Sequence, residues 1–173
     1  MERKSLLVLT GSMGAGKSSV LGEASDILAR RNIPHAAIDL DAFGLAHLPL
    51  QARNDVVMYR ILRCVCKNYS ALGIRRFLVA RAIEDRATLE CCRKAVSARS
   101  ATVCRLTAKL GTMRKRVKMR ELGILQGRFV ARVAKLNSIL DNARLEDFSV
   151  SSDGRSVTQT AREMLLKAGW ISE

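Results

Sequence analysis

The sequence predicts an α/β fold built on a five-stranded parallel β-sheet with helices on both faces. The first observation behind this prediction is that five short apolar segments of strand length alternate with segments whose apolar residues recur at helical spacing. The second is a glycine-rich segment directly between the first strand and the first helix. Strands that alternate with helices form parallel sheets, because each connection crosses over the sheet.

The predicted strands are recognised by their length and by their apolar or β-branched residues. The second of them ends in two carboxylates, Asp39 and Asp41. Side chains two residues apart on a strand point to the same face, so we expect both carboxylates to converge on one site. The predicted strands cover residues 5–10, 36–41, 76–80, 101–106 and 148–151.

Six segments show the spacing of amphipathic helices. Gly73 and Gly169 close the second and the last of them, since glycine readily ends a helix. Gly123 and Gly127 separate the fourth from the fifth. The predicted helices cover residues 20–28, 50–69, 83–99, 110–121, 129–143 and 157–168.

Length and composition are those of one globular domain, which we expect to span residues 1–173. The chain contains no apolar run that could span a bilayer and no segment typical of a signal peptide, so we expect a cytoplasmic protein without a membrane partner. Its five cysteines form no C-x-x-C pair, and we expect them to be buried, reduced thiols. The oligomeric state is not predicted.

The formal net charge is +14, and the excess is concentrated in the middle of the chain. Residues 61–135 contain 19 basic and 4 acidic side chains. Such a region is typical of arginines that bind phosphate groups, of a nucleic-acid surface, or of solvated helix faces.

The segment GSMGAGKSS at residues 11–19 matches the Walker A pattern G-x-x-x-x-G-K-[ST]. Glycines permit a tight loop whose backbone N–H groups point inward and surround the oxygens of a triphosphate. Lys17 then reaches the β- and γ-phosphates, and the Ser18 hydroxyl ligates Mg²⁺ at the start of a helix. We therefore predict that ATP binds to Gly11, Ser12, Met13, Gly14, Ala15, Gly16, Lys17, Ser18 and Ser19.

Two classes of nucleotide-binding protein are disfavoured by what the sequence lacks. No N-K-x-D segment for guanine follows the loop, and the strand at residues 76–80 does not end in the aspartate of hydrolytic ATPases. The pair Asp39 and Asp41 stands at the end of the second strand instead. The sequence therefore disfavours both a GTPase and a motor ATPase.

With these motifs the chain resembles the small P-loop kinases, a group that includes adenylyl-sulfate kinase, gluconate kinase, shikimate kinase and chloramphenicol phosphotransferase. The resemblance spans nearly the whole chain and depends on residues 11–19, 38–41, 103–121 and 149–165. It implies the P-loop NTPase fold in a single domain. It also implies an arginine-rich lid after the fourth strand, here about residues 108–128, and a loop after the fifth strand that borders adenine.

The resemblance assigns Lys17 and the loop amides to the phosphates, and the acidic pair to metal and acceptor. Asp39 is expected beside Ser18 at the Mg²⁺ ion and Asp41 beside the acceptor hydroxyl as catalytic base, although the two roles could be exchanged between these residues. Arg114, Arg116 and Arg120 are the lid candidates, and the last two are four residues apart on one helix face. Arg81, just after the third strand, is a weaker candidate for an anionic group of the substrate. His35 and His47 show no pattern of partner residues, so we expect ordinary surface or packing roles for them.

The sequence thus predicts a cytoplasmic, Mg²⁺-dependent kinase that transfers the γ-phosphate of ATP to a hydroxyl of a small molecule or nucleotide. Residues 43–69 show no pattern that identifies the acceptor. One alternative is a kinase of nucleic-acid ends, which the basic middle region suggests but an aromatic content of 4% disfavours, since few rings are available to stack bases. The other is a regulatory module that binds nucleotide without catalysis.

Overall fold

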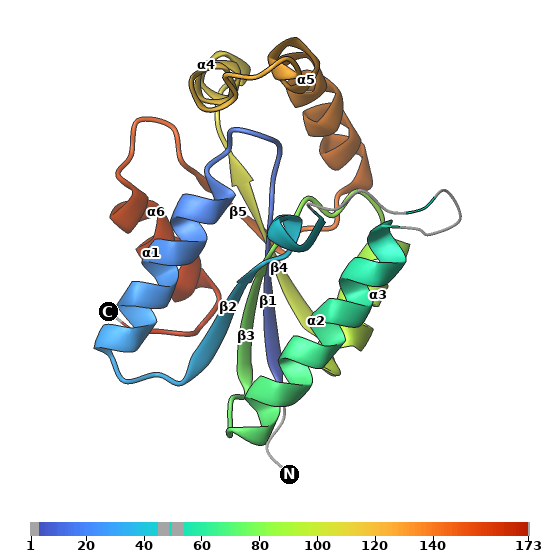
Figure 1. Ribbon diagram of the computed structural model, residues 1–173. Coiled ribbons are helices and arrows are strands. Elements are labelled where there is room, and N and C mark those ends of the chain that lie inside the picture. Colours follow the sequence, from blue (N-terminus) through green and yellow to red (C-terminus); the bar gives the residue numbers. More distant parts are fainter. Residues whose placement is uncertain (1–3, 45–48, 50–53, 173) are drawn as a thin grey trace.

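A computed structural model describes residues 4–44, 49 and 54–172 of the chain. Its centre is a five-stranded parallel sheet with the strand order β2-β3-β1-β4-β5 (Figure 1). This confirms the predicted fold class. The strands are β1 (Ser5–Thr10), β2 (His35–Asp39), β3 (Arg76–Ala80), β4 (Ala101–Thr107) and β5 (Phe148–Ser151).

Helices cover both faces of the sheet. The helices α1 and α6 lie on one face and α2 and α3 on the other, while α4 and α5 lie beyond the carboxyl ends of the strands (Figure 1). The helices are α1 (Lys17–Arg30), α2 (Asn54–Ala71), α3 (Arg86–Val96), α4 (Leu110–Arg120), α5 (Gln126–Ala143) and α6 (Val157–Lys167), and a short 3₁₀ helix, η1, covers Leu40–Gly44.

Each face of the sheet has its own apolar core, because successive side chains of a strand point to opposite faces. On β1, Leu7 and Leu9 pack toward α1 and α6, whereas Leu6 and Val8 pack toward α2 and α3. All four are buried, as expected for a central strand of a parallel sheet. The first core also includes Met113 of α4, so the helices above the sheet edge are anchored to the main core.

The prediction that Asp39 and Asp41 share a strand is wrong. Pairing of β2 with β3 ends at Asp39 opposite Ala80, the last residue of β3. Beyond that point the chain has no ladder partner, and it turns into η1 with Leu40 fully buried. Asp41 therefore comes from η1 and Asp39 from β2, and their side chains are not held on one face by a common strand.

The predicted start of the helix at residues 83–99 also differs from the structure. α3 begins at Arg86 rather than residue 83, because the Asp85 side chain caps it by accepting from the Thr88 N–H at 2.7 Å. The Ile83 N–H instead donates to Thr10 Oγ1 at 2.9 Å. The described part of α2 starts at Asn54. Residues 50–53 of the predicted second helix, like His47, lie outside the described residues.

The five cysteines are free thiols, but they are not all buried as expected. Cys66, Cys92 and Cys104 are buried, whereas Cys64 and Cys91 are exposed on the solvent faces of α2 and α3. The apolar composition of the chain does not show which face of a helix a cysteine occupies. In the described residues no helix has the length and apolar character needed to cross a membrane.

Candidate active site

The phosphate loop connects β1 to α1, and at two of its positions a neighbouring backbone oxygen leaves no room for a side chain. At Gly14, φ is +78°, and a Cβ atom would lie 2.3 Å from the backbone oxygen of Met113 on α4. At Gly11 a Cβ atom would lie 2.6 Å from the backbone oxygen of Leu106 on β4. The backbone of the loop is thus in close contact with α4 and β4, and glycine is needed at both points of contact.

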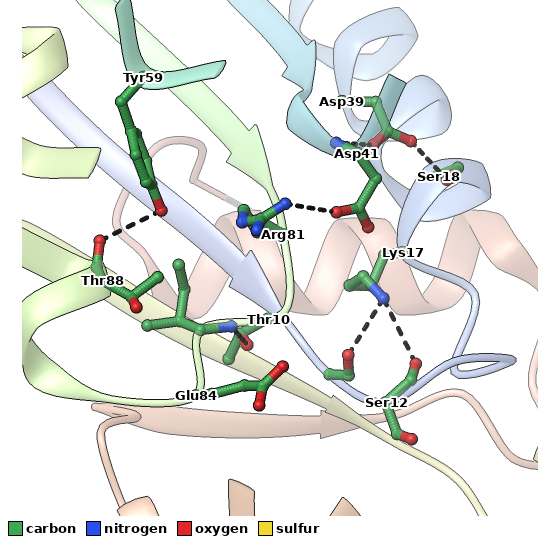
Figure 2. A network of polar contacts seen from close by, with 12 residues as sticks. Thr10, Ser12, Lys17, Ser18, Asp39, Asp41, Tyr59, Arg81, Glu84 and Thr88 are labelled. Atoms are coloured by element: carbon green, nitrogen blue, oxygen red, sulfur yellow. Dashed lines mark hydrogen bonds and ion pairs between the residues drawn. The ribbon is translucent and has the colours of Figure 1, made fainter. Parts of the chain in front are cut away.

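Lys17, the first residue of α1, points back over the loop. Its Nζ donates to the backbone oxygens of Gly11 at 3.0 Å and Ser12 at 3.4 Å (Figure 2). Burial lowers the pKa of Lys17 from its ordinary value, and the nearby carboxylates Asp41 and Asp39 oppose that shift. A phosphate group beside this ammonium would favour its charged form.

Ser18, Asp39 and Asp41 meet at the carboxyl end of β2. The Ser18 hydroxyl donates to Asp39 Oδ2 at 2.5 Å, and the Asp41 N–H donates to Asp39 Oδ1 at 3.2 Å (Figure 2). A hydroxyl and a carboxylate held together at the edge of a phosphate loop provide the oxygen ligands that Mg²⁺ prefers. The residues present therefore fit a Mg²⁺ ion at Ser18 and Asp39.

The Asp41 carboxylate points to Arg81. Arg81 Nη1 lies 3.0 Å from Asp41 Oδ1, with the two side chains 25% and 53% exposed (Figure 2). The Arg81 backbone N–H donates to Leu9 O at 3.1 Å, which fixes the residue at the end of β3. The predicted substrate residues are thus in direct contact.

The predicted lid arginines have three different environments on or next to α4. Arg116 donates to Gly14 O at 3.2 Å, to Ser152 Oγ at 2.9 Å and to Ser152 O at 3.1 Å. Arg120 donates to the carboxylate of its neighbour Glu121 at 2.8 Å. Arg114 is exposed and lies outside the cavity that Arg116 and Arg120 line.

These groups surround a cavity of about 720 Å³ at the carboxyl edge of the sheet. Ser12 and Ala15 of the loop are buried beneath it rather than exposed in it, and the Ser12 hydroxyl donates to Val133 O of α5 at 2.8 Å. The predicted residues that line the cavity are Met13, Gly14, Gly16, Lys17, Ser18, Ser19, Asp39, Asp41, Arg81, Arg116 and Arg120.

Sequence reasoning missed the contribution of α5. Phe129, Arg132 and Leu136 line the cavity, and Arg132 lies 3.4 Å from Glu84, which also lines it. The i, i+3 and i+7 spacing of these three residues on a predicted helix was the available signal.

Arg105 is buried at 5% exposure within a strand predicted as apolar. Its guanidinium donates to Asp141 at 2.7 Å and to the backbone oxygen of Asn137 at 3.3 Å. It also lies 3.4 Å from Glu146. These contacts fasten the C-terminal half of α5 to the sheet, which places its N-terminal half beside the cavity.

Ser152, just after β5, is a second residue that the sequence did not single out. Its hydroxyl donates to Ala15 O of the phosphate loop at 2.8 Å and accepts from Arg116. The loop expected after the fifth strand gave its location but not its partners. His35, in contrast, contacts Ser25 and Ile33 away from the cavity, as a packing role predicts.

The sequence matches no family profile and no curated protein. Among solved structures, a gluconokinase from Sinorhizobium meliloti 1021 is 17% identical with a TM-score of 0.62, covering 98% of this chain and 94% of that chain. Shikimate kinase from Acinetobacter baumannii, in complex with shikimate, is 16% identical with a TM-score of 0.63 over 98% and 96%. The APS (adenylyl-sulfate) kinase of Mycobacterium tuberculosis, in complex with AMPPNP and APS, is 17% identical with a TM-score of 0.62 over 97% and 99%. The chain therefore has the fold of the small P-loop kinases, the group that its motifs resemble.

Proposed function

We propose that this protein is a Mg²⁺-dependent kinase that transfers the γ-phosphate of ATP to a hydroxyl group of a small molecule or nucleotide. The observation that carries this proposal is that one cavity combines a phosphate loop with two carboxylates that have different partners. Asp39 is hydrogen-bonded to Ser18 of the loop, whereas Asp41 faces the part of the cavity lined by Arg81. The cavity thereby offers one position for a metal ion, beside Asp39, and a separate position for the acceptor, beside Asp41.

The loop amides and Lys17 bind the phosphates of ATP. Lys17 has hydrogen bonds only to backbone oxygens among the described residues, so its ammonium can exchange them for phosphate oxygens. Ser18 and Asp39 would hold a Mg²⁺ ion, which would neutralise negative charge on the phosphates of ATP. The hydrogen bond between the two residues keeps their oxygens side by side at the edge of the loop.

Asp41 orients the acceptor hydroxyl and takes its proton. The hydroxyl oxygen forms a bond to the γ-phosphorus while the bond from that phosphorus to the β–γ bridging oxygen breaks, and its electron pair leaves with ADP. Arg116 and Arg120 on the lid segment, residues 108–128, act on the charge that spreads over the transferring phosphoryl group. Closing of this segment would exclude water from the site.

A nucleic-acid end is the second candidate acceptor, and the basic side of α5 favours it. Arg128, Arg132 and Lys135 line a hollow of about 500 Å³ together with Glu84, which lies 3.4 Å from Arg132; the hollow shares Glu84, Arg132 and Leu136 with the main cavity. Clustered cations suit phosphate groups. Oligonucleotide binding that weakens steeply with rising salt, and phosphorylation of the oligonucleotide end, would favour this acceptor over a small molecule.

The test is a screen of a metabolite pool for compounds that make ADP release depend on an added acceptor, with oligonucleotides as one fraction. Lys17→Ala should abolish transfer and weaken ATP binding, because the central cation of the loop is lost while its amides remain. Lys67→Ala, which removes an exposed lysine of α2, is the matched control and should retain activity. Full activity of Lys17→Ala would contradict the proposal.

A further inference from the structure

The peptide bond between Ala15 and Gly16 belongs to the phosphate loop, but a residue outside the loop holds its orientation. The Ala15 oxygen accepts a buried hydrogen bond from Ser152 Oγ at 2.8 Å. Because a trans peptide is planar, its N–H points opposite to its C=O. The Gly16 N–H therefore points away from Ser152, which is 6% exposed and does not line the main cavity.

The Gly16 N–H is available to a ligand. It donates to no other group among the described residues, and Gly16 itself lines the main cavity. The Ala15 N–H, in contrast, donates to Ser12 O at 3.2 Å within the loop. Gly14 and Gly16 have φ of +78° and +99°, whereas φ of Ala15 between them is not positive. Such alternation is typical of the backbone concavities that bind anions through their N–H groups.

The glycine at position 16 also makes the orientation of this peptide easy to reverse. Glycine adopts φ of either sign, so rotation about the bonds on both sides of the peptide meets little steric resistance there. The reversed peptide would present the Ala15 oxygen in place of the Gly16 N–H. Because a carbonyl oxygen has partial negative charge, it would repel a phosphate group. The hydrogen bond from Ser152 opposes this reversal.

Arg116 of α4 strengthens the contact between Ser152 and the loop. A serine hydroxyl has one proton, and Ser152 Oγ has two oxygens within reach, Ala15 O at 2.8 Å and Thr107 O at 3.4 Å. Arg116 donates to Ser152 Oγ at 2.9 Å and to the Ser152 backbone oxygen at 3.1 Å. A charged donor polarises the hydroxyl and strengthens the hydrogen bond that this hydroxyl donates in turn.

We infer that Ser152 is a positioning residue for ATP, because it holds the Ala15–Gly16 peptide with the Gly16 N–H directed at a phosphate group. The inference rests on the proposed function, and it adds a residue between β5 and α6 to the groups that determine phosphate binding. Ser152 acts only through this peptide. The loop is thereby ordered before the nucleotide binds, and a site that is ordered in advance binds more tightly.

The test measures the binding of inorganic triphosphate in the presence of Mg²⁺ by titration calorimetry. This probe has no adenine, so its affinity reports phosphate binding and not contacts with the base. Ser152→Ala should weaken triphosphate binding by about tenfold, as expected for a hydrogen bond to a charged group. Ser152→Thr keeps the hydroxyl and should bind triphosphate nearly as the wild type does. Ser149→Ala, which removes an exposed hydroxyl on β5, is the matched control and should bind it unchanged.

A second measurement follows the Gly16 amide itself by NMR. Triphosphate should move the Gly16 amide proton resonance downfield in the wild type, because the N–H donates to an anion, and should move it much less in Ser152→Ala. A variant that was merely destabilised would show the wild-type shift in its folded molecules, so this measurement separates positioning from stability. The comparison also decides if the additional methyl group of Ser152→Thr does not fit the buried site.

The outcomes distinguish this inference from the proposed function. If the wild type and Ser152→Ala bind triphosphate equally well, or if the Gly16 resonance moves equally in both, Ser152 has no positioning role and the kinase proposal stands. A wild-type protein that binds neither Mg·ATP nor triphosphate overturns the proposed function and the inference with it.

Discussion

The Ser18 hydroxyl and the Asp39 carboxylate are hydrogen-bonded at 2.5 Å across the junction between α1 and β2. Ser18 lies in the first turn of the helix that follows the phosphate loop, and Asp39 is the last residue of its strand. The strand β2 ends at the carboxyl edge of the parallel sheet, and the phosphate loop leaves β1 at the same edge. This brings the two residues together. This contact defines the metal position in the proposed mechanism.

The first prediction concerns that metal position. Asp39→Asn and Ser18→Ala should each raise the Mg²⁺ concentration needed for half-maximal turnover by about 10–100-fold, because each removes an oxygen ligand or the bond that orients it. The measurement is a Mg²⁺ titration at fixed ATP. Asp26→Asn, which removes an exposed carboxylate on α1, is the control. An unchanged titration in Asp39→Asn would place the metal elsewhere.

The second prediction separates the cysteines by reactivity toward iodoacetamide. Burial raises the pKa of the thiol to about 11 for Cys66 and to about 12 for Cys92 and Cys104. At pH 8 about one part in a thousand or less of these thiols is thiolate, the reactive form. Native protein should therefore be alkylated at the exposed residues Cys64 and Cys91 and denatured protein at all five, as peptide mass analysis can show. Rapid alkylation of Cys92 in native protein would contradict the packing of α3.

The parts of this protein that depend on local sequence could be predicted. The five strands were predicted from apolar runs. The phosphate loop was predicted from its glycines, whose positions are fixed by the backbone conformation of the loop. The end of β2 could not be predicted, because β3 stops at Ala80 and that length limits its neighbour. A strand's last residue depends on its partner as much as on its own side chains.

Contacts between segments that are far apart in the chain could not be predicted from the sequence either. Arg116 was a lid candidate because of its charge, but its bonds to Ser152 and Gly14 join segments that are 36 and 102 residues away from it. Arg105 lies in a strand that was predicted from its apolar residues, and its carboxylate partner Asp141 is 36 residues further along the chain. Residue type indicates that such groups need partners, but only the fold identifies those partners.

The third prediction compares two glycines of the same strand–loop–helix unit. Gly14→Ala should destabilise the protein by about 1–3 kcal/mol, because φ is +78° and the new Cβ would meet the Met113 backbone oxygen at 2.3 Å. Gly22→Ala on α1 meets nothing within 4 Å and should stabilise it by about 0.5–1 kcal/mol. Urea unfolding measures both. A Gly14→Ala variant as stable as the wild type would show that the loop does not contact α4 as closely as described.

The last prediction separates two arginines of α4 that the sequence treated alike. Arg116 is partly buried and makes three hydrogen bonds to Gly14 and Ser152, so Arg116→Ala should lower the free energy of unfolding by about 1–3 kcal/mol and weaken ATP binding. Arg120 is exposed and bonds only its neighbour Glu121 among the described residues. Arg120→Ala should therefore change stability by no more than about 0.5 kcal/mol.

Turnover should separate Arg120 from Arg114, two exposed arginines of α4. Arg120→Ala should lower turnover while ATP affinity is retained, because a lid cation acts mainly on charge that develops in the transition state. Arg114→Ala removes a cation four residues before Lys118 on the exposed surface of the same helix, away from the cavity, and should leave turnover unchanged. Steady-state kinetics, ATP titration and urea unfolding of the three variants are the measurements. Equal losses of turnover in Arg114→Ala and Arg120→Ala would mean that α4 contributes only its general positive field, and the proposed contact of Arg120 with the transferring phosphate would then be wrong.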